Sequence, residues 1–145
     1  MRLLIQRVKS ASVTVEGKKV SEIKKGLLVL VGINQGDSRK KAEALAEKLT
    51  KLRIMADSEG KMNLSVTEVS GEILVVSQFT LYADTSGGRR PSFLHAAKPD
   101  QAEKIYRYFL KSLKNKGNHV QTGAFGEYME IALSADGPVT ILLDN

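Results

Sequence analysis

The feature that most constrains this chain is a short, uninterrupted apolar run at residues 73–76 (Ile-Leu-Val-Val). A run of this length without alternation is typical of a strand that is buried on both faces. The residues that follow it at once are Ser77, Gln78, Phe79 and Thr80. Hydroxyl and carboxamide groups can orient a ligand, while an aromatic ring can hold its apolar part. The sequence therefore predicts a binding pocket at the end of this strand.

Several other segments have the pattern of strands. Residues 27–31 form a second continuous apolar run, which predicts a central strand. Residues 11–15 and 19–23 alternate between apolar and polar side chains on either side of a turn at 16–18, which predicts a hairpin. The remaining strand-like segments are residues 3–8, 119–122, 128–133 and 139–143. The chain is therefore rich in strands along most of its length.

Two segments have a helical period instead. The first can be capped by Asp37 or Ser38, and its apolar stripe consists of Ala42, Leu45, Ala46, Leu49 and Leu52. The second begins at Pro99 and ends at Gly117, and its stripe consists of Ala102, Ile105, Tyr106, Phe109 and Leu113. Between the central strands and this second helix, residues 83–98 are too polar and glycine-rich for a regular element. Loops of this length within a compact domain are often functional.

Two helices set against many strands, with antiparallel hairpins among them, predict an α+β fold. We expect a curled, mostly antiparallel sheet or open β-barrel that is covered by the two helices. With 145 residues, of which 42% are hydrophobic, the chain can form one core, so we expect a single domain over residues 1–145. No Pro-, Gly- or Ser-rich linker divides it.

Composition excludes several classes of protein. The chain has no cysteine, which excludes disulfides, thiolate metal sites and cysteine nucleophiles. No apolar run approaches the length of a membrane span, and residues 1–7 acquire charge too early for a signal peptide. We therefore expect a cytoplasmic protein that does not associate with membranes.

The chain is basic, with a formal net charge of +6 and a pI of about 9.6. Such an excess favours polyanions such as nucleic acid, although lysine and glutamate also enrich on heat-stable surfaces. Cations lie beside both apolar stripes. They are Arg39, Lys40, Lys41, Lys48 and Lys51 in the first helix, and Lys104, Arg107, Lys111 and Lys114 in the second. Each set either is a solvated face or contacts phosphates.

The sequence offers few groups for acid–base or metal chemistry. His95 and His119 are the only histidines, and neither has acidic neighbours at metal-ligand spacing, so we expect no metal. His95 could act as a base for Ser77 or Thr80, but no partner motif accompanies it. Residues 87–90 lack the spacing of a phosphate-binding loop, and we expect no cofactor. What remains is a pocket that acts through backbone N–H groups and neutral side chains, which suffices for a reactive ester.

Gly137 and Pro138 interrupt two strand-like runs near the end of the chain. One interpretation is a turn that ends one strand and begins the next. The other is a cis peptide bond, which we expect here because such bonds occur where the backbone geometry demands them. A cis Gly-Pro pair can point neighbouring carbonyl oxygens in one direction and so form a rigid wall of acceptors.

Segments along the whole chain together match one known family. They are residues 6–8, 11–13, 27–32, 61–66, 77–84, 88–93, 122–126 and 136–140. In these segments the chain resembles the D-aminoacyl-tRNA deacylases, also called D-tyrosyl-tRNA deacylases. The resemblance implies an enzyme that hydrolyses the ester of D-aminoacyl-tRNA and releases the free D-amino acid. This activity is chiral proofreading in translation, and glycyl-tRNA would also be cleaved because glycine has no side chain to reject.

The resemblance also implies an assembly. The family is homodimeric, with two pockets at the subunit interface, and Gly137 and Pro138 match the pair that enters the partner's pocket. Their carbonyl groups would occupy the space that an L side chain needs, which excludes L-aminoacyl groups. Arg7 matches an arginine that holds this pair in place; read alone, it could also be a surface cation at a strand edge.

The same resemblance assigns roles within the pocket. Ser77, Gln78, Phe79 and Thr80 match a catalytic motif in which backbone N–H groups around Gln78 and Phe79 orient the ester carbonyl and stabilise the oxyanion. Thr80 corresponds to a proposed nucleophile. Since no base accompanies it, we favour attack by water, assisted by the 2′-hydroxyl of the terminal adenosine. Phe125 matches a residue of the adenosine pocket.

One position departs from the family pattern, and two other functions stay open. Ala135 stands where the family commonly has Asn, which removes a side-chain hydrogen bond that Asp136 or backbone groups would have to replace.

A non-catalytic RNA-binding module of the same fold would keep the basic faces but need no pocket. A relative with relaxed chirality, which clears small L-aminoacyl groups, would hold its Gly-Pro bond in trans.

Overall fold

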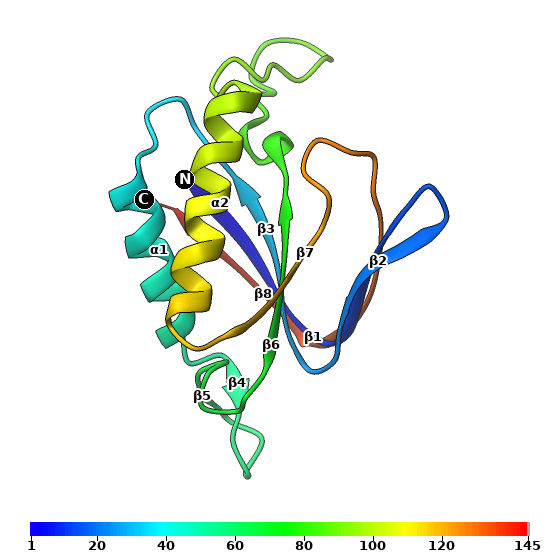
Figure 1. Cartoon of the computed structure of the whole chain (residues 1–145), viewed down its shortest axis with the longest axis vertical. Helices are drawn as coiled ribbons and strands as arrows, with labels where there is room; N and C mark the ends of the chain where they lie inside the picture. The colour runs from blue at the N-terminus through cyan, green and yellow to red at the C-terminus, as the bar shows by residue number, and fades with distance from the viewer. Residues whose placement is uncertain (145) are drawn as a thin grey trace.

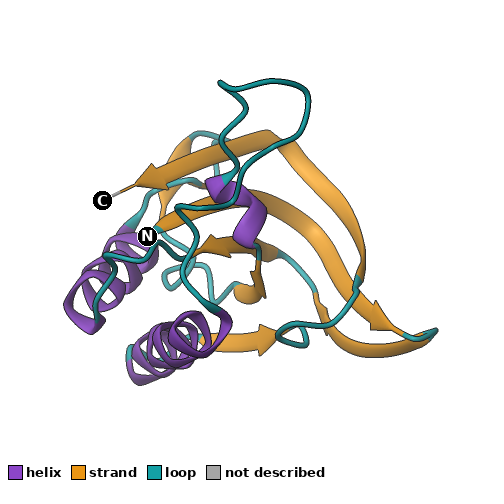
Figure 2. Ribbon diagram, turned by 90° about the horizontal axis from the view of Figure 1, so that it is seen from above, coloured by secondary structure: helices purple, strands orange, loops and turns teal. Residues whose placement is uncertain are grey.

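The computed structural model describes residues 1–144, and this part of the chain forms a six-stranded sheet with two α-helices along one side (Figure 1). The strands lie in the order β2 (Lys18–Ile23), β1 (Arg2–Val15), β3 (Gly26–Gly32), β6 (Glu72–Ser77) and β7 (His119–Thr122), while β8 (Glu130–Asp144) pairs with β1. The helices are α1 (Arg39–Lys51) and α2 (Pro99–Asn115). The sheet curls strongly when seen from above (Figure 2). The predicted α+β class and the curled sheet covered by two helices are confirmed.

The sheet is mixed in direction. Strand β1 runs antiparallel to β2, β3 and β8, whereas β3–β6 and β6–β7 are parallel pairs. The parallel pairs follow from the connections, because α1 lies between β3 and β6 in the chain and α2 lies between β6 and β7. A crossover helix of this kind returns the chain in the same direction. Antiparallel pairing still covers most of the sheet, as the sequence predicted.

Two breaks that the sequence predicted between strands do not occur. Residues 3–8 and 11–15 belong to one strand, β1, and residues 139–143 belong to β8 together with residues 130–133 of the predicted strand 128–133. The two long strands pair along most of their length, with the register shifting between Gln6 and Val8 and between Val8 and Ser10. The interpretation of Gly137–Pro138 as a turn between strands is therefore wrong, since extra residues of β8 bulge out of a continuous strand.

The core has two layers, one on each face of the sheet. Ile73 and Val75 of β6 face the helices, while Leu74 and Val76 face the inside of the curl, so β6 is buried on both faces as predicted. Ser38 caps α1, and its Oγ accepts a hydrogen bond from the N–H of Lys41 at 3.4 Å. Both predicted apolar stripes contribute buried side chains. The helices thus close one side of the sheet.

Shorter elements complete the chain. β4 (Met55–Ala56) and β5 (Met62–Leu64) form a separate small sheet, at the bottom of Figure 1. Directly after β6 comes η1 (Phe79–Tyr82), a single turn of 3₁₀ helix. In the loop 83–98, Asp84 and Ser92 pair through their backbones, so the loop folds back on itself. No helix within residues 1–144 is long and apolar enough to cross a membrane.

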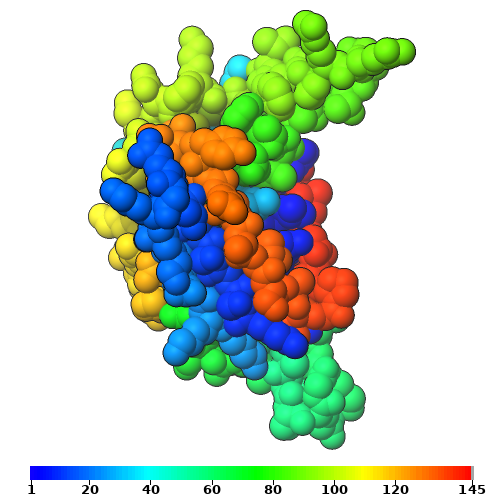
Figure 3. Space-filling view, turned by 90° about the vertical axis from the view of Figure 1, so that its right-hand side faces the viewer, coloured from blue at the N-terminus to red at the C-terminus, as the bar shows by residue number. Residues whose placement is uncertain are grey.

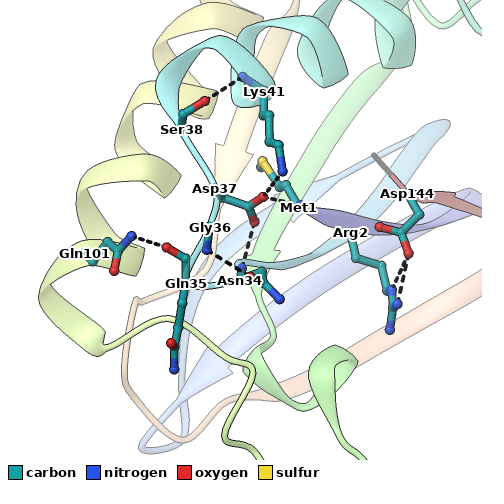
Figure 4. Close-up of polar contacts among 10 residues, drawn as sticks. All are labelled: Met1, Arg2, Asn34, Gln35, Gly36, Asp37, Ser38, Lys41, Gln101 and Asp144. Atoms are coloured by element: carbon teal, nitrogen blue, oxygen red, sulfur yellow. Dashed lines mark hydrogen bonds and ion pairs between the residues drawn. The ribbon is translucent and has the colours of Figure 1, made fainter.

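A buried polar cluster holds the connection between β3 and α1 in place (Figure 4). The carboxylate of Asp37 accepts from the ammonium group of Met1 at 2.5 Å and from the N–H of Asn34 at 2.7 Å, and its side chain is 1% exposed. The amide of Gln101, on α2, donates to the carbonyl of Gln35 at 2.9 Å. The same connection pairs with residues 95–97 through the backbone. The N–H of Gln35 donates to the carbonyl of His95, and the N–H of Ala97 donates to the carbonyl of Ile33. This cluster therefore fixes one wall of the pocket described next.

Candidate active site

A pocket of about 400 Å³ opens beyond the carboxyl ends of β3 and β6. Its wall combines the first turn of α2, residues 93–97 of the long loop and the chain after β7. Among the described residues that line it, none has an ionisable side chain. The lining is aliphatic and aromatic, with the hydroxyl group of Ser77 as its polar side chain. Such a pocket can bind an apolar or aromatic group but contains no acid or base of its own.

The structure gathers the predicted catalytic segment at this pocket. Ser77 and Phe79 line it. Phe79 is 56% exposed, and its ring packs edge-to-face on Phe93 with a centroid distance of 5.0 Å. Gln78 and Thr80 lie beside it, where the amide nitrogen of Gln78 donates to the hydroxyl of Thr80 at 2.5 Å. The prediction of a pocket at the end of this strand thus agrees with the structure.

The backbone at the end of β6 leaves two donors unused. The N–H of Gln78 donates to the carbonyl of Val31 at 2.8 Å, so this group completes the β3–β6 pairing and, contrary to the expectation from the family resemblance, is not available to a ligand. The chain then turns into η1, where the N–H of Leu81 returns to the carbonyl of Gln78 at 3.3 Å. Within the described chain, neither the N–H of Phe79 nor that of Thr80 donates a hydrogen bond. These two adjacent groups can therefore bind an oxygen atom of a ligand.

Phe125 reaches the pocket from the opposite side. It follows β7, lines the pocket and packs against the ring of Tyr106 with a centroid distance of 5.6 Å. The hydroxyl of Tyr106 donates to the carbonyl of Val75 at 2.8 Å, and burial raises the pKa of this phenol. Tyr106 is thus a fixed support from α2, which holds the ring of Phe125 at the pocket wall.

Gly137 and Pro138 lie elsewhere on the molecule. Both are exposed on β8, and no residue of β8 lines the pocket of its own chain. Figure 3 shows β8, in orange to red, running over this face of the molecule. The Gly137–Pro138 peptide bond is cis, in agreement with the expectation from the sequence. A single chain therefore presents the pocket and this pair as two separate surfaces.

Arg7 braces the pair from behind. Its side chain donates to the carbonyl of Asp136 at 3.1 Å and to that of Ile54 at 2.8 Å, and it forms an ion pair with the carboxylate of Asp136 at 3.1 Å. Only 8% of Arg7 is exposed, so the interpretation as a surface cation is wrong. The Asp136 side chain thus provides a polar anchor next to the exposed Ala135.

The backbone at Gly137 requires glycine. Its φ is +127°, a region that L side chains rarely adopt. An added Cβ would also lie 2.8 Å from the Cγ2 of Val139 and 3.3 Å from a guanidinium nitrogen of Arg7. Both observations make a side chain here strained, so backbone geometry favours glycine at this position.

Comparisons with known proteins cover nearly the whole chain. The sequence profile of the family described as D-Tyr-tRNA(Tyr) deacylase matches residues 4–144. The chain belongs to this family. It is 52% identical over 145 residues to a D-aminoacyl-tRNA deacylase from Thermosipho africanus (strain TCF52B), covering 100% of this chain and 97% of that protein. It is 50% identical over 145 residues to one from Bacillus cereus (strain G9842), covering 100% of this chain and 99% of that protein.

Solved structures show the same fold. One is described as the c-Myc DNA Unwinding Element Binding Protein, with a TM-score of 0.95, 40% identity and coverage of 100% of this chain and 99% of that one. A second, described as a probable eukaryotic D-amino acid tRNA deacylase, has a TM-score of 0.85 and 18% identity, and covers 99% and 98% of the two chains. The second likeness concerns the fold alone.

His95 lies outside the pocket lining. It is exposed and borders a separate polar hollow with Arg2, Tyr82 and Asp84. Burial raises the pKa of Tyr82 to about 12, so its hydroxyl stays protonated at neutral pH. Within residues 1–144, no cluster of three acidic or histidine side chains could hold a metal ion. Sequence reasoning did not place Phe93, in the long loop, or Ala102, on the apolar stripe of α2, in the pocket wall.

Proposed function

We propose that this chain hydrolyses the ester bond of D-aminoacyl-tRNA, releasing the free D-amino acid and tRNA, as chiral proofreading. The observation that carries the proposal is the pocket itself, in a chain that belongs to the D-Tyr-tRNA(Tyr) deacylase family. It offers aromatic walls and two unused backbone donors, but no ionisable lining group within the described residues. An aminoacyl ester is reactive enough for such a site, whereas an amide is not.

In the proposed reaction, the ester carbonyl oxygen accepts hydrogen bonds from the N–H groups of Phe79 and Thr80. These donors stabilise the negative charge that develops on this oxygen in the transition state. One such donor lowers the activation free energy by about 3 kcal/mol. Water attacks the carbonyl carbon, the bond to the 3′-oxygen of the ribose breaks, and the proton passes to that oxygen with help from the 2′-hydroxyl. Phe125 supports the terminal adenine through its aromatic face.

We assign Thr80 a positioning role. Its hydroxyl already accepts a hydrogen bond from the amide of Gln78, and no base lies in the pocket to activate it. A threonine hydroxyl without such a base is a weak nucleophile. Ser77, which lines the pocket, can hydrogen-bond the substrate but equally lacks a base.

We further propose that the functional unit is a homodimer in which Gly137 and Pro138 of one protomer complete the pocket of the other. Support comes from their exposure on β8, away from the pocket of their own chain, and from the exposed apolar side chains Leu133 (41%) and Leu142 (54%) on the same strand. Main-chain atoms placed there would collide with an L side chain and leave a D side chain free. Glycyl-tRNA, without a side chain, would also be cleaved.

The test compares hydrolysis of D-Tyr-tRNA and L-Tyr-tRNA by the purified protein. We expect the D ester to be cleaved at least about 100-fold faster than the L ester, because the excluded side chain has no alternative place in the pocket. Loss of both esters at similar rates would instead support the relaxed-chirality relative. If both esters were hydrolysed no faster than in buffer alone, the proposed deacylase activity would be refuted.

One comparison favours a second candidate, a nucleic-acid-binding protein without catalysis. A solved structure with 40% identity is described as a protein that binds a DNA unwinding element, and the net charge of +6 would suit such a role. The pocket and its unused donors have no purpose in that alternative. The same experiment separates the two, since a binding module would retain D-Tyr-tRNA without hydrolysing it.

A further inference from the structure

We propose that one face of α2 binds the acceptor stem of the tRNA whose 3′ end occupies the pocket; this inference rests on the proposed function. The face, which we call the α2 basic stripe, consists of Lys104, Arg107, Lys111 and Lys114, all exposed. Nucleic-acid backbones are recognised mainly by such cations, independently of base sequence. That mode of binding suits an enzyme that must accept many tRNAs.

The spacing of these residues makes them a continuous surface. They follow one another at intervals of three, four and three residues, which places them within about 80° of each other around the helix axis and over about 15 Å of its length. The buried residues Ile105, Phe109 and Leu113 lie on the other side of α2. The stripe therefore points outward from the core.

The stripe does not face the neighbouring helix. On the flank toward α1, the ring of Tyr108 contacts Arg39 at 5.7 Å, and its hydroxyl donates to Glu43 at 3.4 Å. The opposite flank carries Glu103, Arg107 and Leu110 toward β7, and α2 lies between α1 and β7 in both ribbon views (Figures 1 and 2). The stripe thus borders the side of α2 on which the pocket lies.

A surface path connects the pocket to the stripe. The first turn of α2 forms part of the pocket wall through Pro99 and Ala102. Next to the pocket, a shallow hollow of about 150 Å³ lies between α2 and β7, and Phe125 lines both spaces. Arg107 lines this hollow as well. A polynucleotide that leaves the pocket past Phe125 therefore meets the stripe at Arg107.

The charges of the stripe are largely available. Within residues 1–144, no carboxylate forms an ion pair with Lys104, Lys111 or Lys114, whereas Arg107 pairs with Glu103 at 2.6 Å. Exposed pairs of this kind contribute little to stability, so a phosphate can replace Glu103 as the partner at small cost. Positive charge so arranged is complementary to the phosphates of an RNA helix.

The experiment removes charge from the stripe and measures hydrolysis of a long and a short substrate. The variant is Lys104→Gln/Lys111→Gln/Lys114→Gln, and its control is Lys40→Gln/Lys48→Gln/Lys51→Gln, which removes the same charge from α1. The substrates are D-Tyr-tRNA and D-tyrosyl-adenosine, which lacks the acceptor stem. All these lysines are exposed, so both variants should fold.

For D-Tyr-tRNA at low salt, we expect the stripe variant to lose about 10- to 100-fold in kcat/KM. We also plot log kcat/KM against log salt concentration. The magnitude of the slope should be smaller by about 2 to 3 in the stripe variant, because each of the three cations contributes about 0.7 to 0.9 to it. D-tyrosyl-adenosine should be hydrolysed at the wild-type rate by both variants. An equal loss in the α1 control, or no loss in the stripe variant, would overturn the inference while the proposed function stands. Failure of the wild-type protein to cleave either substrate would overturn the proposed function itself.

Discussion

At the scale of single residues, the chemistry of this site depends on what the pocket lacks as much as on what it contains. Ser77 and Phe79 could be assigned to a pocket from sequence because polar and aromatic residues directly follow a buried run, whereas Phe125 could be assigned only through the family resemblance. The burial of Arg7 could not, since its partners Asp136 and Ile54 are far away in the chain. Which backbone donors are unused also depends on the pairing of Gln78 with Val31, which only the fold reveals.

The first prediction concerns pH and Thr80. Because no described residue lining the pocket ionises, the rate of D-Tyr-tRNA cleavage should show no inflection from a protein group between about pH 5 and 8, where a histidine base would titrate. Thr80→Ala should keep the rate within about 10-fold of wild type and leave this profile unchanged. The measurement is kcat under saturating substrate across that range, with His95→Ala as the control. Complete loss of turnover in Thr80→Ala with retained binding would show that Thr80 is the nucleophile.

At the scale of elements, the helices and central strands could be predicted because their apolar periods are local properties. The joining of predicted strands into β1 and β8 could not, because it depends on long-range pairing between the two ends of the chain. The same holds for the bulge at Gly137, which hydrophobic periodicity presents as a break. Strand continuity here has a consequence for function, since it holds the Gly137–Pro138 pair on a rigid strand instead of a turn.

The second prediction tests that bulge with a matched pair of substitutions. Gly137→Ala introduces a side chain at a φ of +127° and places its Cβ 2.8 Å from Val139, so the local backbone must move. We expect the ratio of D- to L-Tyr-tRNA cleavage to fall by about 10-fold or more, with a smaller change in the D rate. Gly88→Ala is the control, because Gly88 also has a positive φ of +89° but nothing lies near its added Cβ. If Gly137→Ala left the ratio of D- to L-Tyr-tRNA cleavage unchanged, the Gly137–Pro138 pair would not be responsible for chiral selection.

At the scale of the whole molecule, the chain carries two separate surfaces that the proposed homodimer would bring together. One is the pocket beyond β3 and β6, and the other is the exposed pair on β8 with Leu133 and Leu142 nearby in sequence. Sequence patterns indicate each surface separately, whereas their meeting across two protomers is what we propose. The family resemblance was the only signal for a dimer in the sequence.

The central claim is that the pair on one protomer selects substrates in the pocket of its partner, and mixed dimers test it most directly. Ala102→Phe fills the pocket but leaves β8 intact, whereas Gly137→Ala leaves the pocket open but alters the pair. In a mixed dimer, the open pocket of the Gly137→Ala protomer faces an unaltered pair. Native mass spectrometry would confirm that mixed dimers form.

The measurement is cleavage of L- and D-Tyr-tRNA per Gly137→Ala protomer as excess Ala102→Phe protein is added. The account predicts that L-Tyr-tRNA cleavage falls toward the wild-type level while D-Tyr-tRNA cleavage persists. L-Tyr-tRNA cleavage that stays constant once mixed dimers have formed would contradict it.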